Sequence, residues 1–414
     1  AFAVAQSGRP GPVVLALPED MLSAQADVPD IPPAVTVAAS PSPAQVAAVT
    51  GALAGARRPL VVIGGPHWSA AAAADLQRFA EGWGLPVAVT FRRQDRMDNA
   101  HPHYVGDLGV GMNPRLGARL AEADLILAIG TRMGDIATGG YEIMDPARPH
   151  PRLIHVHADA GELGRVFRPD PGIALPAPAM VAALAATVPP NAVPWADWTR
   201  AARADYEGWQ RPAPTPGAVR LEEVVAHLRD ALPPQAIVTN GAGNYAAFLH
   251  RYHRFRQVGT QLAPTSGSMG YGFPAAVAAS LEHPDRPVIC MAGDGCLQMT
   301  LNEMSTAVQH GARPVVIVAD NGRYGTIRMH QEKHYPGRVS GTDLANPDFA
   351  ALARAYGGVG ETVTEQAQFP DALGRALAAG KLAVIHLKLD PEMLTTGATV
   401  AQVRAQGFAA QAKG

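Results

Sequence analysis

Two apolar runs in the second half of the chain end in an acid or amide beside glycine, and this pairing constrains the fold more than any other feature. Residues 288–293 are followed by Asp294, and residues 314–319 are followed by Asp320 and Asn321. Asp294 and Asn321 lie 27 residues apart, which leaves room for a loop, one helix of about four turns and a second strand. A right-handed βαβ crossover would bring both strand ends to one edge of a parallel sheet.

Asp294 and Asn321 would then offer a carboxylate and an amide oxygen side by side, and these ligands suit a hard divalent cation such as Mg²⁺. The glycines on either side of Asp294 would let a phosphorylated ligand approach the backbone. A Gly-Asp-Gly alone equally fits a tight turn whose aspartate caps the next helix. The glycine-containing stretch 321–325 favours the cation site over the simple turn.

Asp294 in its Gly-Asp-Gly, followed at this distance by Asn321, resembles the cofactor motif of thiamine-diphosphate enzymes, in particular the acetolactate synthase, benzoylformate decarboxylase and pyruvate oxidase branch. The resemblance implies a Mg²⁺ ion held by Asp294, Asn321 and the backbone carbonyl of Arg323, with diphosphate oxygens and a water completing an octahedron. The family usually has two asparagines in a row, whereas this chain has Asp320 in the first place. That departure leaves the ligand position intact.

A second segment, residues 267–276, resembles the family loop that binds the aminopyrimidine ring through backbone groups. The resemblance implies that Met269 lies beneath the cofactor as a wedge. Such a wedge bends the cofactor so that its 4′-imino group reaches C2 of the thiazolium. The alternative is a buried methionine that fills a gap in the core.

A third segment, residues 240–246, follows a predicted strand at 236–239 and contains a G-x-G-x-x-A pattern, the weak form of a dinucleotide fingerprint. A dinucleotide site would also need an acidic residue about 20 positions further on, but residues 256–270 contain no Asp or Glu. The resemblance implies instead that this loop binds the diphosphate with N–H groups at a helix N-terminus. The residues predicted to contact the cofactor are Gly241, Ala242, Gly243, Asn244, Gly267, Ser268, Met269, Asp294, Gly295, Cys296, Asn321, Arg323, Tyr324 and Gly325.

The start of the chain resembles the end of the family's pyrimidine-binding domain, with a last helix at residues 1–6 and a closing strand within 8–20. Relatives activate the cofactor with a glutamate near the start of that domain, which hydrogen-bonds N1′ of the pyrimidine. The resemblance therefore implies that this chain carries only the last part of the domain, and that the activating glutamate is not among its residues.

Composition indicates a cytoplasmic enzyme. The net charge is −2 and no long charge run occurs, which argues against a nucleic-acid or anionic-membrane partner. Cys290 and Cys296 are too few for a disulfide framework or a zinc site, and Cys290 is predicted to be a small core residue. No run reaches the roughly 18 apolar residues of a membrane helix, and residues 1–6 lack the basic start of a signal peptide.

Alternating helix-like and strand-like runs predict an α/β fold with two doubly wound parallel-sheet domains, a central Rossmann-like domain and a diphosphate-binding domain, plus the N-terminal remnant of a third. Proline-rich stretches suggest the boundaries. The expected organisation is a remnant at 1–22, a linker at 23–42, a central domain at 43–188, a linker at 189–218 and a thiamine-diphosphate domain at 219–414. Trp195, Trp198 and Trp209 in the second linker are predicted packing anchors, and the tail from Thr395 is expected to be helical.

The central domain resembles one that binds FAD in acetolactate synthases and pyruvate oxidases but not in benzoylformate decarboxylases. Residues 130–139 keep part of the flavin-associated pattern, with Ile136 where the synthases carry a second arginine. Residues 108–114 differ from the His-containing loop of the synthases. A structural Rossmann-like domain is therefore expected in preference to FAD binding.

The family's chemistry implies decarboxylation of a small-molecule 2-oxo acid, followed by protonation or C–C ligation of the enamine, in a homodimer or homotetramer. His330 stands where acetolactate synthases carry a tryptophan that selects the second oxo acid, so it is a candidate substrate-pocket residue or an exposed helix histidine. Two alternatives stay open. The chain could be a non-catalytic remnant that binds the cofactor, or a nicotinamide-dependent dehydrogenase built on residues 240–246.

Overall fold

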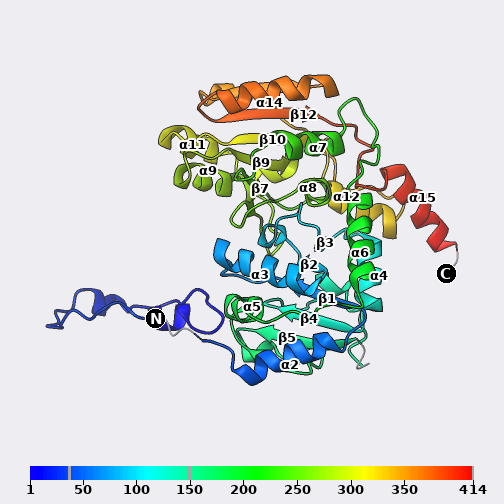
Figure 1. The fold of residues 1–414 in the computed structure, drawn as a ribbon. Coiled ribbons are helices and arrows are strands. Elements are labelled where there is room, and N and C mark those ends of the chain that lie inside the picture. Colours follow the sequence, from blue (N-terminus) through cyan, green and yellow to red (C-terminus); the bar gives the residue numbers. More distant parts are fainter. Residues whose placement is uncertain (36–38, 148–150, 413–414) are drawn as a thin grey trace. The chain divides into compact units, whose positions relative to one another are not determined.

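The computed structural model describes residues 1–35, 39–147 and 151–412 (Figure 1). They form two compact units, one made of residues 1–88 and 117–199 and the other of residues 89–116 and 200–414. The structure contains two six-stranded sheets with flanking helices. The predicted α/β fold with two parallel sheets is confirmed, whereas the domain boundaries drawn from composition stay predictions.

The first sheet has the strand order β3-β2-β1-β4-β5-β6, which is the order of a doubly wound Rossmann sheet. Strands β1, β4 and β5 pair in parallel and are almost wholly buried, as expected for a sheet covered on both faces. The bounds are β1 Pro59–Ile63, β2 Val87–Thr90, β3 Tyr104–Leu108, β4 Leu125–Ile129, β5 Arg152–His157 and β6 Gly172–Ala174. The helices are α1 Phe2–Gln6, α2 Pro43–Ala54, α3 Ala70–Trp83, α4 Pro114–Glu122, α5 Ala177–Ala185 and α6 Ala196–Trp209.

The second sheet has the order β11-β12-β10-β9-β7-β8, and its neighbouring strands pair in parallel. Its strands are β7 Ile237–Asn240, β8 Gln261–Leu262, β9 Val288–Gly293, β10 Val315–Asp320, β11 Val359–Val363 and β12 Ala383–Lys388. Its helices are α7 Leu221–Ala231, α8 Tyr245–Tyr252, α9 Gly272–Glu282, α10 Asp294–Gln298, α11 Glu303–His310, α12 Gly325–His334, α13 Phe349–Ala355, α14 Phe369–Ala378 and α15 Val400–Gln411. Short 3-10 helices lie at Glu19–Leu22, Gln94–Arg96, Ile136–Thr138, Ala160–Glu162 and Gln366–Gln368.

Strand β9 shows why the second sheet is apolar on both faces. Ile289 and Met291 belong to one core cluster, and Cys290 and Ala292 belong to another on the opposite side. Side chains alternate between the two faces of a strand, so helices must cover both. Cys290 is fully buried, which confirms its predicted place in the core.

Neighbouring strands β9 and β10 fix the position of the candidate site. Gly293 pairs with Ala319 in parallel register, so Asp294 and Asp320 follow at the same carboxyl edge of the sheet. The crossover between the two strands contains two short helices, α10 and α11, rather than the single helix of about four turns that the spacing suggested. Thr300 lies between the two helices, and its hydroxyl donates to the carbonyl of Gly270 at 3.1 Å.

One further expectation from the sequence is wrong in detail. Residues 13–17 form no strand and are exposed, because no neighbouring strand among the described residues pairs with their backbone. The stretch 189–218, predicted to be a linker, contains helix α6 between its prolines, and its place as a linker stays a prediction. Trp195 is buried and donates to the carbonyl of Trp83 at 3.0 Å, as a packing anchor should.

The end of the chain is helical as predicted, and α15 begins at Val400 after a capping box made by Thr399 and Gln402. Glu332 of α12 is almost fully buried and binds both Arg328 and Arg404, the latter from α15. Among the described residues, no helix combines the length and apolar character needed to cross a membrane.

Candidate functional site

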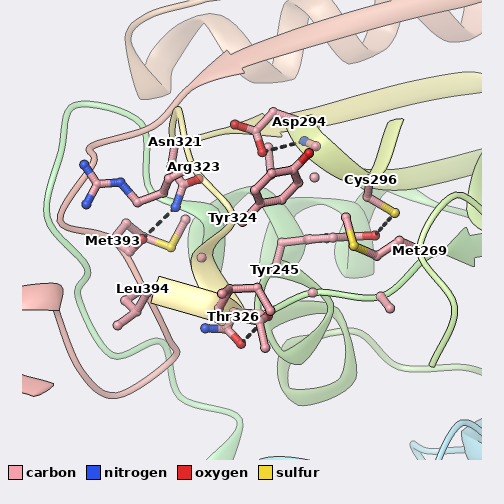
Figure 2. A pocket seen from close by; sticks show the side chains of 18 of the residues that line it. Tyr245, Met269, Asp294, Cys296, Asn321, Arg323, Tyr324, Thr326, Met393 and Leu394 are labelled. Atoms are coloured by element: carbon pink, nitrogen blue, oxygen red, sulfur yellow. Dashed lines mark hydrogen bonds between the residues drawn. The ribbon is translucent and has the colours of Figure 1, made fainter. Parts of the chain in front are cut away.

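A pocket of about 260 Å³ opens at the carboxyl edge of the second sheet, where open α/β folds generally bind ligands. The β7–α8 loop, the loop before α9, the β9–α10 and β10–α12 connections and residues 393–394 surround it (Figure 2). The lining residues are Ala242, Gly243, Asn244, Tyr245, Gly267, Met269, Gly293, Asp294, Gly295, Cys296, Ala319, Asn321, Arg323, Tyr324, Gly325, Thr326, Ile327, Met393 and Leu394.

Asp294 is the most deeply buried charged side chain of this pocket, with 3% of its surface exposed. Its Oδ1 accepts from the N–H of Gly295 at 2.8 Å, and its Oδ2 accepts from the N–H of Gly322 at 3.0 Å. Burial raises the pKa of Asp294 to about 6, and the nearby carboxylate of Asp320 adds to the rise. A buried carboxylate with no cationic partner of its own is a ready ligand for a metal ion.

Asp320 differs from Asp294 because it has cationic partners. Its Oδ2 accepts from Nε2 of His386 at 2.7 Å and from Nζ of Lys388 at 2.8 Å. Burial alone would raise the pKa of Asp320, but the hydrogen bonds from His386, Lys388 and Asn346 lower it well below its usual range. The negative charge at this edge of the sheet is therefore already compensated at Asp320 and uncompensated at Asp294.

Asn321 supplies the second side-chain oxygen that the sequence predicted. Its Nδ2 donates to the carbonyl of Met393 at 3.1 Å, which fixes the amide so that the opposite atom, Oδ1, is left for another donor or a cation (Figure 2). The turn after Asn321 is held by two backbone bonds, from Tyr324 N–H to Thr342 and from Leu344 N–H to Gly322. Arg323, whose carbonyl is the third predicted metal ligand, lies between Gly322 and Tyr324, the residues that make these two bonds.

Glycine is required where the loops meet. A Cβ on Gly295 would lie 2.5 Å from the ring of Tyr324, and one on Gly293 would lie 2.8 Å from the ring of Tyr245. These separations are far below ordinary van der Waals contact. The Gly-Asp-Gly is therefore needed for the packing of two tyrosines as well as for ligand approach.

Cys296, Tyr245 and Met269 lie together on the pocket wall in Figure 2. Sγ of Cys296 accepts from the hydroxyl of Tyr245 at 3.3 Å and from the N–H of Gly270 at 3.1 Å. The Tyr245 hydroxyl in turn accepts from the N–H of Gly241 at 3.1 Å. These contacts join the three loops that carry the predicted cofactor residues.

We expect a Gly241→Ala substitution to destabilise the protein by about 1–3 kcal/mol. The added Cβ would overlap Sγ of Cys296 and lie 3.0 Å from the Tyr245 hydroxyl, so the three loops would have to separate. Gly374→Ala is a matched control, because its Cβ would meet nothing within 4 Å in helix α14 and should stabilise slightly. Denaturant unfolding of both variants measures the difference, and equal midpoints would contradict the expected clash.

The structure brings most of the predicted cofactor residues together, with three exceptions among the candidate residues. Gly241 lies behind the pocket wall, and Ser268 is exposed with its hydroxyl 2.9 Å from that of Ser266. His330 is exposed on α12 and its ring stacks on His334 with centroids 6.2 Å apart. Its role in substrate selection stays a prediction.

Several lining residues were missed, namely Tyr245, Gly293, Ala319, Thr326, Ile327, Met393 and Leu394. Tyr245 and Thr326 immediately follow predicted loop residues, so extension of each loop by one turn of the next helix would have found them. Met393 and Leu394 follow β12 by several residues, and no local pattern marks them.

The first unit has a separate pocket of about 460 Å³ at the carboxyl ends of β1, β4 and β5. Pro66, His67, Gly130 and His157 line it. This is the usual ligand position of a doubly wound sheet. The expectation that this domain holds no FAD stays a prediction.

Comparison with known protein families gives two matches. Residues 241–387 match the thiamine pyrophosphate enzyme C-terminal TPP binding domain, and residues 46–184 match the thiamine pyrophosphate enzyme central domain. Thiamine pyrophosphate is the same compound as thiamine diphosphate. The first match includes Asp294, Asn321 and all the loops that line the pocket, but it ends before the lining residues 393–394.

Individual relatives agree with these matches. The chain is 33% identical over 392 residues to the acetolactate synthase large subunit of Parasynechococcus marenigrum, covering 92% of this chain and 62% of that protein. It is 28% identical to the acetolactate synthase isozyme 2 large subunit of Escherichia coli, covering 94% of this chain and 70% of that protein. A solved thiamine diphosphate-dependent 4-hydroxybenzoylformate decarboxylase from Rhodococcus jostii RHA1 superposes with a TM-score of 0.75 at 27% identity, over 94% of this chain and 72% of that one. The chain thus spans about three fifths of the first relative's length.

Proposed function

The chain belongs to the thiamine pyrophosphate enzymes, and we propose that it acts as a Mg²⁺-dependent lyase or carboligase on a 2-oxo acid, with the cofactor in the pocket around Asp294. One observation carries this proposal above the others. Asp294 and Asn321 stand at the carboxyl ends of neighbouring parallel strands, beside a pocket walled by glycine loops. A carboxylate and an amide oxygen in this arrangement suit Mg²⁺ and the diphosphate that it bridges.

The residues of the pocket fit the cofactor in three ways. Asp294, Asn321 and the carbonyl of Arg323 would hold Mg²⁺, since all are oxygen donors and Asp294 lacks a cationic partner among the described residues. The loop 241–244 leads into α8, whose N-terminal N–H groups are suited to bind phosphate oxygens. Met269 packs against the core and also faces the pocket, so it would support the cofactor from below.

Bound thiamine diphosphate would supply the electron sink for decarboxylation. The task of this chain's residues is then to bind, orient and exclude water. Ile327, Met393 and Leu394 give the pocket an apolar side, which lowers the local dielectric around charges that form there. Tyr245 and Cys296 hold the loops in place through their contact.

The proposed substrate class is supported by the relatives' names. The chain is similar in sequence to acetolactate synthases and in fold to a 4-hydroxybenzoylformate decarboxylase, and 4-hydroxybenzoylformate is itself a 2-oxo acid. We therefore propose the 2-oxo acid class and no single member of it.

Calorimetric titration of thiamine diphosphate into the chain, with and without Mg²⁺, tests the cofactor site, and NAD serves as the negative control. Saturable binding that requires Mg²⁺ supports the proposal, whereas binding of NAD alone would overturn it. Carbon dioxide release from a panel of 2-oxo acids tests the reaction, measured on the chain alone and with the N-terminal part of a full-length relative added. Cofactor binding without turnover in either mixture would favour a non-catalytic cofactor-binding protein.

A further inference from the structure

Asn346 occupies a position that the cofactor motif does not include. It lies in the connection between α12 and α13, yet its Nδ2 donates to Oδ2 of Asp294 at 2.8 Å and to Oδ1 of Asp320 at 2.7 Å. One amide group therefore bridges the two carboxylates at the carboxyl edge of the second sheet. Two buried carboxylates in this position repel each other unless donors lie between them.

The side-chain amide of Asn346 is itself oriented by a hydrogen bond. Nε2 of Gln298, the last residue of α10, donates to Oδ1 of Asn346 at 2.7 Å. This bond leaves both Nδ2 hydrogens for Asp294 and Asp320. The N–H of Gly322 also donates to both carboxylates, at 3.0 Å each, so Asn346 and Gly322 enclose the gap between them.

The far side of Asp320 is anchored to the sheet. Lys388 pairs with Asp320 and His386 pairs with Val318 in the β10–β12 register. Residues two apart on a strand project from the same face, which explains why both side chains reach Oδ2 of Asp320. Asp320 is thus fixed on its outer side by β12 and on its inner side by Asn346.

We propose that Asn346 is a positioning residue for the metal ligand Asp294, which it holds in place against the anchored Asp320. The chain of contacts runs from His386 and Lys388 through Asp320 and Asn346 to Asp294. Partners of this kind, which hydrogen-bond a ligating carboxylate, commonly tune metal affinity. The inference rests on the proposed cofactor site, because it acts through the metal that Asp294 would hold.

Binding of Mn²⁺ in place of Mg²⁺, followed by electron paramagnetic resonance at saturating thiamine diphosphate, tests the role of Asn346. We expect Asn346→Ala to weaken Mn²⁺ binding by about 10- to 100-fold. Asn302→Ala is the matched control, since Asn302 is an exposed asparagine that contacts Glu303 outside the pocket, and it should bind Mn²⁺ as the wild type does. The far-ultraviolet circular dichroism of each metal-free variant checks that the fold is kept.

A double-mutant cycle separates positioning from a general loss of structure. Gln298→Ala should weaken Mn²⁺ binding by a smaller factor alone and by almost nothing in the Asn346→Ala background, because both act through one contact. Gln298→Ala also carries the test if Asn346→Ala fails to fold. Wild-type affinity in Asn346→Ala, or additive losses in the cycle, would overturn the inference and leave the cofactor site standing. Absence of Mn²⁺ binding in the wild type would overturn both.

Discussion

An Asp294→Ala variant is expected to lose Mg²⁺-dependent binding of thiamine diphosphate by more than about 100-fold. Loss of an outer partner of a metal ligand typically costs about 10- to 100-fold in affinity, so loss of the ligand itself should cost more. Asp294 is the one pocket carboxylate among the described residues without a cationic partner. The neighbouring carboxylate of Asp320 is already held by His386 and Lys388, so it is poorly placed to take over the role of Asp294.

The measurement is calorimetric titration of the cofactor at several Mg²⁺ concentrations. Asp371→Ala is a suitable control, because Asp371 is an exposed aspartate in the first turn of α14 and lies outside the pocket lining. That variant should bind as the wild type does. An Asp294→Ala protein that keeps its fold and an undiminished Mg²⁺ dependence would contradict both the metal site and the proposed function.

The sequence predicts the centre of this site because local patterns encode it. An apolar run followed by Gly-Asp-Gly and another followed by Asp320 and Asn321 specify two buried parallel strands with polar residues at their carboxyl ends. Their pairing, Gly293 with Ala319, follows from the crossover between them. The resemblance then assigns a role to each residue that the pairing brings together.

Local sequence patterns do not predict the contacts that Asn346 and His386 make with the two carboxylates. Asn346 is 52 residues from Asp294 along the chain, and His386 is 66 residues from Asp320. Tertiary packing alone unites them. A partial signal does exist, because His386 and Lys388 are polar residues at alternate positions of the otherwise apolar strand β12, and polar residues at that spacing share one face.

Other differences have physical causes that also act over long distances. Helix α6 lies between prolines that mark the stretch as a linker, yet Trp195, just before its start, is buried and donates to the backbone carbonyl of Trp83. Residues 13–17 have a strand-like composition but no strand beside them among the described residues. A strand forms only where a neighbouring strand pairs with its backbone. The sequence of the segment itself does not show whether such a neighbour is present.

Acidification is expected to destabilise the second unit through two buried histidines. Burial lowers the pKa of His250 to about 3 and that of His253 to about 4, with Arg92 and Arg229 adding to the respective shifts. In the unfolded chain the two imidazoles take up protons near the ordinary histidine pKa of about 6.5. In the folded protein they are still neutral at that pH. Stability is therefore fully present above about pH 6.5 and is lost as the pH falls toward about 4.

Linkage gives the size of this loss as about 2 kcal/mol for each histidine between about pH 7.5 and about pH 5. Substitution of either residue by glutamine removes its contribution, so the melting temperature of His253→Gln or His250→Gln should depend less on pH than that of the wild type. Exposed His310 at the end of α11 provides the control His310→Gln, which should keep the wild-type dependence. Calorimetric melting at both pH values distinguishes these cases, and unchanged pH dependence in both buried variants would show that other groups govern acid unfolding. Both histidines are far more buried than His310. Burial keeps their imidazoles neutral in the folded state, so acid favours the unfolded chain, in which they can take up protons.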